Sequence, residues 1–263
     1  MPKIHPTAVV EEGALLEANV EVGPFCFISK EVKIGEGTRI AQGAHVCGNT
    51  TIGKHNEIFS HAVLGSIPQD LKYAGEEVEL IIGDYNKIRE FTLFNPGTLG
   101  GGNKTVIGNH NLFMGYVHIG HDVHVGDHCI LANAATLAGH VEIGNYTVIG
   151  GMTPIHQFVK IGDFAMIAGA SALSQDIPPS CLAEGNRAVL RGLNLNGLRR
   201  HFERADIDAL RLAYRKLFES GQPLQETAAS LLANESNEKV LQMCRFIVES
   251  TRGIPFERKN NGE

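Results

Sequence analysis

The sequence of 263 residues predicts a mainly β protein, a parallel β-helix of six-residue repeats followed by a small C-terminal α-helical domain. Three observations predict this fold. A large apolar residue recurs at every sixth position over the first two thirds of the chain, the composition combines 30 Gly with only 6% aromatic residues, and the pattern becomes helical after residue 178. An α-helix has a period of 3.6 residues and a strand a period of 2, so neither alone explains a period of six.

The repeat can be followed along residues 1–178, which we expect to form the β-helix. Its phase breaks after Leu64 and after Phe94 and recovers each time. Chance does not produce 26 such positions in phase, and the large residues are Ile4, Val10, Leu16, Val22, Ile28, Ile34, Ile40, Val46, Ile52, Ile58, Leu64, Ile82, Ile88, Phe94, Ile107, Phe113, Ile119, Val125, Leu131, Leu137, Ile143, Ile149, Ile155, Ile161, Ile167 and Leu173.

Each hexad has the pattern of a short strand followed by a turn. The residue four places after the large residue is mostly small or β-branched, as at Ala8, Cys26, Thr38 and Thr147. Gly often follows the large residue directly, which suits a tight turn. The pattern resembles the hexapeptide repeat of left-handed β-helix proteins, in which three hexads form one triangular coil of 18 residues. The left-handed sense follows from this resemblance and from no general rule.

Two segments interrupt the repeat, Asp70–Ile81 and Gly100–Val106. Because the phase recovers after both, we expect loops near residues 70–81 and 100–106 that project from a continuous wall. A tolerated surface insertion is one interpretation. The other, slightly favoured, is a contribution to a binding face, where the insertions of solenoid proteins often collect.

Residues 179–263 are predicted to form the helical domain. A first helix is expected over residues 206–218 and a second over residues 240–250, because each segment carries apolar residues at helical spacing on one stripe. Gly221 and Pro223 separate the two helices.

Composition and charge exclude several classes of protein. A net charge of −6 argues against a nucleic-acid partner, and no run of Lys and Arg indicates a membrane-surface patch. The chain has no apolar run long enough for a transmembrane segment or a signal peptide. Its five cysteines lack CxxC spacing and fit apolar fillers in a reducing compartment. We therefore expect a cytoplasmic protein.

The candidate chemistry lies in the segment HIGHDVHVGDH, which holds His118, His121, His124 and His128. Solvated turn histidines, a metal site and an acid–base site are the three interpretations. The segment lacks the HxH and HExxH patterns of a zinc site within one chain, so we expect no metal.

Stacking of coils favours acid–base chemistry. A shift of 18 residues carries Asp122 onto His140 and His121 onto Gly139 and then Gln157. A glycine stacked over a histidine leaves a slot beside the imidazole and exposes a backbone N–H. This suits acyl transfer, with a neutral His as base, a carboxylate that orients the ring and an N–H that stabilises the oxyanion.

Longer stretches carry a closer resemblance, which covers nearly the whole chain. They resemble the family of UDP-N-acetylglucosamine acyltransferases, which catalyse the first step of lipid A biosynthesis. The stretches are IPQDLKYAGE (67–76), VHIGHD (117–122), CILANAATLAGHVEIG (129–144), IGGMTPIHQF (149–158), SQDIPP (174–179) and STRGIPF (250–256). GHD, LAGH and IHQF at these spacings are the specific motifs.

The resemblance implies transfer of an (R)-3-hydroxyacyl chain from acyl carrier protein to the 3-position of UDP-N-acetylglucosamine, or to the amine of a 3-amino analogue. It implies a homotrimer of prism-shaped β-helices, with the active site between neighbouring prisms. It also implies no separate cofactor, because the thioester already activates the acyl group. His121 would be the general base, Asp122 its partner and the Gly139 amide the oxyanion donor. The implied substrate-binding residues are Asp70, Lys72, His118, His140, His156, Gln157, Asn194 and Arg200.

Three positions bear on substrate choice. The chain has Asn95 where many family members have His, and Asn196 where they have Glu, and both bear on acceptor recognition. Gly169 occupies the position at which the family measures acyl length, and a glycine there implies a longer acyl chain.

Arg199 and Arg204, beside Arg200, fit either a solvated helix face or a surface for diphosphate and an acidic carrier protein.

Three alternatives remain open. One is the hexapeptide-repeat N-acyltransferase that acts on the 2-amino group of a related UDP-sugar, although that enzyme normally carries a further domain before the repeats. A second is a nonenzymatic scaffold that binds carrier protein. The third is a zinc anhydrase, because trimeric β-helix anhydrases assemble a three-His zinc site across subunits.

Overall fold

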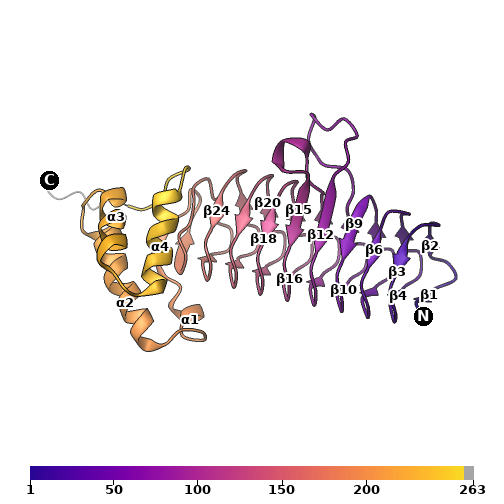
Figure 1. Ribbon diagram of the computed structural model, residues 1–263, viewed down its shortest axis with the longest axis horizontal. Helices are drawn as coiled ribbons and strands as arrows, with labels where there is room; N and C mark the ends of the chain where they lie inside the picture. Colours follow the sequence, from indigo (N-terminus) through magenta and orange to yellow (C-terminus); the bar gives the residue numbers. More distant parts are fainter. Residues whose placement is uncertain (258–263) are drawn as a thin grey trace.

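The computed structural model describes residues 1–257, and its first two thirds form a parallel β-helix with three sheets, called A, B and C (Figure 1). Successive strands belong to A, B and C in turn, so one coil contributes one strand to each sheet. Sheet A continues beyond the coils into two further strands, which pair with each other in antiparallel fashion.

Each sheet forms one side of the prism and consists of short strands. Sheet A contains β1 (Lys3–Ile4), β4 (Glu21–Val22), β7 (Arg39–Ile40), β10 (Glu57–Ile58), β13 (Lys87–Ile88), β16 (Leu112–Phe113), β19 (Ile130–Leu131), β22 (Val148–Ile149), β25 (Met166–Ile167), β26 (Cys181–Glu184) and β27 (Val189–Leu193). Sheet B contains β2 (Val9–Val10), β5 (Phe27–Ile28), β8 (His45–Val46), β11 (Val63–Leu64), β14 (Leu93–Phe94), β17 (His118–Ile119), β20 (Thr136–Leu137) and β23 (Pro154–Ile155). Sheet C contains β3 (Leu15–Leu16), β6 (Lys33–Ile34), β9 (Asn49–Ile52), β12 (Glu79–Ile82), β15 (Lys104–Ile107), β18 (His124–Val125), β21 (Glu142–Ile143) and β24 (Lys160–Ile161).

The predicted repeat matches the strands residue by residue. Every large residue of the hexads from Ile4 to Ile167 is the last residue of its strand, and Leu173 forms an isolated bridge with Ile155. These residues are buried from the second coil onward. Ile4 in the first coil is 46% exposed, because no earlier coil covers it.

The chain turns at three edges of the prism, the A–B, B–C and C–A edges, each of which takes its name from the two sheets that it joins. One residue in many of these turns has a left-handed backbone conformation, which usually favours glycine. At the C–A edge this residue is often aromatic, and its ring stacks on the ring one coil away at centroid distances of 4.6–5.1 Å. This stack contains His55, Tyr85, His110, His128, Tyr146 and Phe164. Ring stacking thus offsets part of the conformational cost of the turns.

Two loops leave the B–C edge and project from the same side of the prism (Figure 1). The first loop, residues 65–78, joins β11 to β12, and the second loop, residues 95–103, joins β14 to β15 and contains the short 3-10 helix η1 (Leu99–Gly101). The predicted ranges end too late, because Glu79–Ile81 belong to β12 and Lys104–Val106 to β15. These strands are four residues long and pair along their full length, which a period of six does not reveal.

Residues 179–263 were predicted to be helical, but the strands β26 and β27 come before the first helix. β26 pairs in parallel with β25 and so continues sheet A past the last coil. Helices follow as α1 (Leu195–Leu198), α2 (Arg204–Tyr214) with the π-helical turn η2 (Arg215–Glu219), α3 (Leu224–Asn234) and α4 (Glu238–Glu249). The two expected helices correspond to α2 with η2 and to α4, whereas α3 was not predicted.

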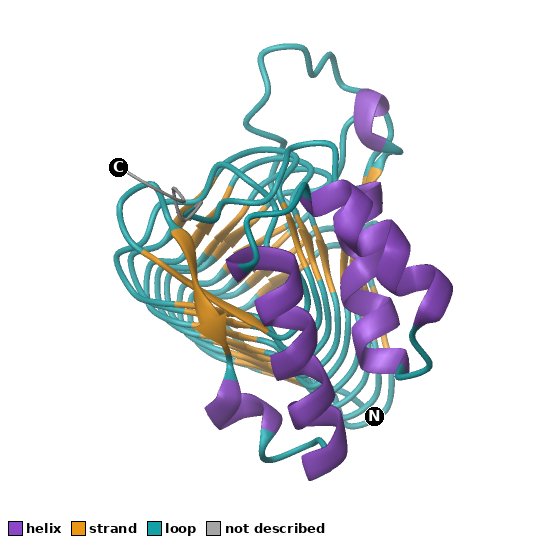
Figure 2. Ribbon diagram, turned by 90° about the vertical axis from the view of Figure 1, so that its left-hand side faces the viewer, coloured by secondary structure: helices purple, strands orange, loops and turns teal. Residues whose placement is uncertain are grey.

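The helices lie across the C-terminal end of the prism (Figure 2). Gln242 of α4 donates a hydrogen bond of 2.7 Å from its Nε2 to Oδ2 of Asp163 in the last coil. The chain then returns to the prism, where Ser250 Oγ donates to Asp176 Oδ2 at 2.6 Å. Within residues 1–257, no helix has the length and apolar character needed to cross a bilayer.

Candidate active site

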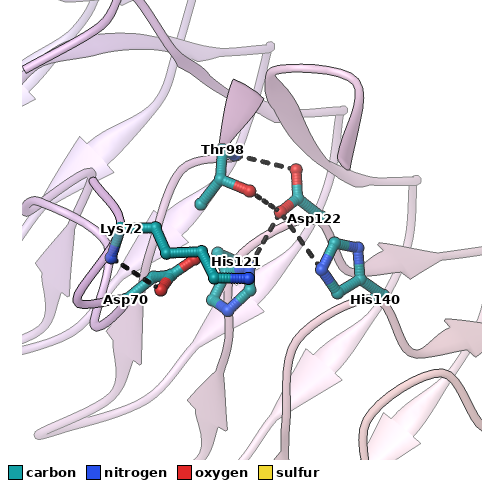
Figure 3. Close-up of polar contacts among 6 residues, drawn as sticks. All are labelled: Asp70, Lys72, Thr98, His121, Asp122 and His140. Carbon is teal, nitrogen blue, oxygen red and sulfur yellow. Dashed lines mark hydrogen bonds and ion pairs between the residues drawn. The ribbon is translucent and has the colours of Figure 1, made fainter. Parts of the chain in front are cut away.

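His121 and Asp122 form a hydrogen-bonded pair at the B–C edge, in the turn after β17 (Figure 3). His121 Nδ1 lies 2.8 Å from Asp122 Oδ2. The Asp122 side chain is 1% exposed and that of His121 is 17% exposed. Because an ionised carboxylate only accepts hydrogen bonds, the proton of a neutral His121 belongs on Nδ1, which leaves the lone pair on Nε2. The pair therefore has the form of an oriented general base.

The stacking expected from the 18-residue coil is present. The backbone N–H of His140 donates to the carbonyl of His121 at 2.9 Å, and His140 Nε2 lies 3.8 Å from Asp122 Oδ2. The rings of His121 and His140 are perpendicular, with centroids 5.0 Å apart. Two imidazoles thus lie beside one buried carboxylate.

Gly139 lies directly against the His121 imidazole. A Cβ at this position would come within 2.5 Å of His121 Cε1, so no larger residue fits there without a shift of the ring. Among the described residues 1–257, no acceptor contacts the Gly139 N–H. The geometry leaves this amide free to donate to an oxyanion beside the base.

Asp70 and Lys72 of the first loop lie on the same side of the molecule as the pair (Figure 3). The backbone N–H of Lys72 donates to Asp70 Oδ1 at 3.0 Å. Burial lowers the pKa of His140 below its ordinary value, while the charges of Asp122 and Asp70 act in the opposite direction. The loop thus adds one negative and one positive group to the surroundings of His121.

His118, His156 and Gln157 also lie along the B–C side of the prism. His118 is half-buried in β17, and burial lowers the pKa of its imidazole. His156 and Gln157 are exposed in the turn after β23. Arg252 Nη2, from the C-terminal segment, lies 3.3 Å from His156 Nδ1. Sequence reasoning did not single out Arg252, which lies 96 residues from its partner.

The remaining predicted residues lie away from the B–C edge. Gly169 is exposed at the A–B edge after β25. Asn194 is buried, where it accepts from Gly197 N at 3.1 Å and donates to the Phe164 carbonyl at 3.0 Å, near the C–A edge. Arg200 is exposed just after α1. A single chain therefore does not bring Gly169, Asn194 or Arg200 to the His121–Asp122 pair.

Asn95 and Asn196, the two residues that depart from the family pattern, differ in their burial and contacts. Asn95 is buried, and its Nδ2 donates to the carbonyls of Ser66 and Ile67, both at 3.1 Å. It therefore links the start of the second loop to the first loop. Asn196 is exposed in α1.

Thr98 of the second loop was not predicted as a site residue. Its backbone N–H donates to Asp122 Oδ1 at 2.8 Å, and its Oγ1 donates to Asp122 Oδ2 at 2.6 Å. Its position after Phe94, where the phase of the repeat breaks, was the only signal in the sequence, because the predicted loop began at Gly100 and the repeat does not relate Thr98 to Asp122.

His121, Asp122 and His140 are also the kind of side chains that bind zinc, and their ligand atoms lie within 4.8 Å of one another. However, Asp122 Oδ2 already accepts hydrogen bonds from His121 and Thr98. These short distances are those of a hydrogen-bonded network.

Comparisons with known proteins agree with one another. Residues 176–255 match the family model "UDP N-acetylglucosamine O-acyltransferase, domain 2", and residues 104–139 match the bacterial transferase hexapeptide model. A curated acyl-[acyl-carrier-protein]–UDP-N-acetylglucosamine O-acyltransferase of Sulfurovum sp. is 66% identical over 260 residues, which cover 99% of this chain and 100% of the relative. A relative of the same name from Sulfurimonas denitrificans is 65% identical with the same coverage.

A solved structure, UDP-N-acetylglucosamine acyltransferase from Campylobacter jejuni, superimposes with a TM-score of 0.94 at 52% identity. The match covers 97% of this chain and 100% of that one. The predicted fold class, a left-handed parallel β-helix of hexapeptide repeats with C-terminal helices, is confirmed.

The lowered pKa of His118 has a measurable consequence. In an NMR titration, the His118 ring, identified by its loss in a His118→Gln variant, should titrate with a midpoint below the ordinary 6.5. Because the folded pKa lies below the unfolded one, the folded state binds this proton less well. The ring's contribution to stability is therefore complete above pH 6.5 and is lost as the pH falls towards the folded pKa. A midpoint at or above 6.5 would contradict this assignment.

Proposed function

Because this chain belongs to the family of UDP-N-acetylglucosamine O-acyltransferases, we propose that it transfers an (R)-3-hydroxyacyl chain from acyl carrier protein to the 3-position of UDP-N-acetylglucosamine or of its 3-amino analogue. This reaction would be the first step of lipid A biosynthesis. The observation that carries the proposal is the His121–Asp122 pair with the free Gly139 amide beside it.

The proposed step follows from the geometry. His121 Nε2 takes the proton from the acceptor group, whose oxygen or nitrogen attacks the thioester carbonyl. Asp122 stabilises the imidazolium that forms, and the Gly139 N–H donates to the oxyanion. The carbon–sulfur bond then breaks, and the thiol of the carrier protein leaves with the proton held by His121. Acylated sugar and free carrier protein are the products, and no separate cofactor takes part.

A homotrimer is part of the proposal. The residues that the family resemblance implies lie at three different edges of one prism, so a site that unites them needs more than one copy of the chain. The A–B edge also exposes the large apolar residues Phe25, Phe91, Tyr116 and Met152, a stripe suited to burial against another copy. In a closed ring of three chains, the B–C edge of one prism would meet a different edge of its neighbour.

The charge distribution supports an acidic protein partner. Residues 1–178 carry 10 Lys and Arg against 18 Asp and Glu, whereas the rest of the chain carries 13 against 11. Arg199, Arg200 and Arg204 are exposed at the C-terminal end. A basic surface there suits both an acidic carrier protein and the diphosphate of the acceptor.

Replacement of the base tests the proposal directly. His121→Ala should reduce turnover about 10²- to 10⁴-fold, because general-base catalysis is lost, while circular dichroism and oligomeric state stay as in the wild type. His124→Ala, an exposed histidine of the same segment on sheet C, is the control and should retain turnover. Near-normal turnover in His121→Ala would refute the assigned base. Carrier-protein binding by a wild type that leaves UDP-sugar unacylated would favour the scaffold instead.

Mixed oligomers test the shared site. His121→Ala and Arg200→Ala should each be impaired at low substrate concentration. Co-assembly of the two in equal amounts should restore about a quarter of the wild-type sites. Each site between two chains needs an intact His121 from one chain and an intact Arg200 from its neighbour, and each of these is present in about half of the cases. The control is a mixture of separately assembled oligomers, which should recover nothing. No recovery on co-assembly would show that both residues serve the same chain.

Acyl preference can be read in one mass-spectrometric assay. Both UDP-sugars are offered with a series of 3-hydroxyacyl carrier proteins of increasing chain length, and the products identify the acceptor group. The wild type should prefer the longer chains, and Gly169→Met should shift the preference to shorter ones, because Gly169 is exposed and a long side chain there would fill space that the proposed acyl chain needs. An unchanged preference would remove Gly169 from the acyl site. If neither sugar is acylated and a UDP-sugar with a free 2-amino group is, the result would favour the N-acyltransferase.

A further inference from the structure

The carboxylate of Asp122 is held by the second loop as well as by His121. Oδ1 accepts from the Thr98 N–H at 2.8 Å, and Oδ2 accepts from Thr98 Oγ1 at 2.6 Å and from His121 Nδ1 at 2.8 Å. Thr98 and Asp122 are both buried. One residue thus contacts both carboxylate oxygens, and its hydroxyl contacts the same oxygen as the catalytic base.

The second loop is built to present Thr98 in this position. The Thr98 carbonyl accepts from the backbone N–H of Gly101 and of Asn103, both at 3.0 Å, which closes the loop on itself. Gly97 N donates to the Glu79 carbonyl at 3.2 Å, which ties the start of the loop to β12. Loop residues held by backbone hydrogen bonds at both ends have little freedom to move.

Gly101 completes the arrangement. A Cβ built on Gly101 would collide with the carboxyl group of Asp122, so a residue with a side chain at this position would displace Asp122 or the loop. The loop therefore packs directly on the carboxylate and excludes water from it, in agreement with the 1% exposure of the Asp122 side chain.

We propose that Thr98 is a positioning residue for the His121–Asp122 pair, and that the second loop serves catalysis by fixing this carboxylate. The inference rests on the proposed function, in which His121 is the base. Two effects follow from the contacts. The two Thr98 bonds fix the rotation of the carboxylate, and so the direction of the His121 ring. The hydroxyl also shares the negative charge of Oδ2, which weakens the hold of the carboxylate on a protonated His121.

The variant Thr98→Val removes the hydroxyl and keeps the shape of the side chain. We expect kcat to fall about 10- to 100-fold with little change in KM, because the base is misplaced rather than substrate binding lost. The rising limb of kcat/KM against pH should also move to higher pH, because the carboxylate without its hydroxyl partner attracts a protonated base more strongly. Within the described part of the chain, the other charged or titratable groups near His121 include His118, His140, Asp70 and Lys72, and all are unchanged in this variant.

The control is Thr105→Val, in the strand that follows the loop. Thr105 is also fully buried, and its Oγ1 has no hydrogen-bond partner within the described residues 1–257. Its replacement removes the same hydroxyl from the same region without touching Asp122, so it should leave kcat and the pH profile as in the wild type. Thr98→Ser restores a hydroxyl and should recover most of the lost kcat. Gly101→Ala should lower kcat as Thr98→Val does.

The outcomes separate this inference from the proposed function. If the wild type acylates the sugar and Thr98→Val matches it in kcat and pH profile, Thr98 does not position the pair. The same conclusion follows if Thr98→Ser is as impaired as Thr98→Val, or if Thr98→Val raises KM alone with an unmoved pH profile. If the wild type itself fails to acylate the sugar, the proposed function fails first.

Discussion

Parallel register between successive coils is the constraint on which the rest of the structure depends. Each strand donates backbone hydrogen bonds to the strand one coil further along, as His118 N does to the Ala135 carbonyl at 3.1 Å. In coils without an insertion, residues 18 apart therefore occupy equivalent places. This register brings Gly139 against His121 and His140 beside Asp122. A shift of one residue would point these side chains to the wrong face of the wall, and the base, its carboxylate and the free amide would separate.

The two inserted loops interrupt the repeat and add groups to the surroundings of Asp122 that the stacked coils alone do not supply. The register alone places only residues of neighbouring coils together, and no hexad residue faces both oxygens of Asp122. The second loop leaves the wall at the B–C edge and returns to it, and so brings Thr98 to a carboxylate 24 residues away. The first loop carries Asp70 and Lys72 to the same side. The wall thus gives rigid positions, and the loops give the site its chemical surroundings.

The features predicted most accurately from the sequence are those that the six-residue period determines. The strands up to β25 end at the predicted large residues, and the proximity of Asp122 and His140 followed from the 18-residue coil alone. Other features depend on the path of the chain between repeats. The contact of Thr98 with Asp122 depends on the close approach of Gly97 to the backbone of Lys104 and on the turn at Gly102, and the early start of β12 depends on pairing with β9 and β15. Asn194, whose contact with substrate stays a prediction, caps α1 through the hydrogen bond that it accepts from Gly197 N, a contact that the six-residue period does not reveal. Helix α3 was missed because its buried residues, Ala228 and Leu231, form only a weak stripe.

The stacked coils also act as a scale of length along the prism. His121 and Gly169 are 48 residues apart with no insertion between them, which corresponds to two and two-thirds coils and about 13 Å along the axis at the usual strand spacing. In the proposed reaction this rise would set the span available to the acyl chain. Gain or loss of one whole coil between the two positions would change that span in a single step of about 4.8 Å, whereas a different side chain at residue 169 would adjust it within a step. The number of coils would thus set the acyl length in large steps, and the side chain at residue 169 would set it in small ones. The two can change independently.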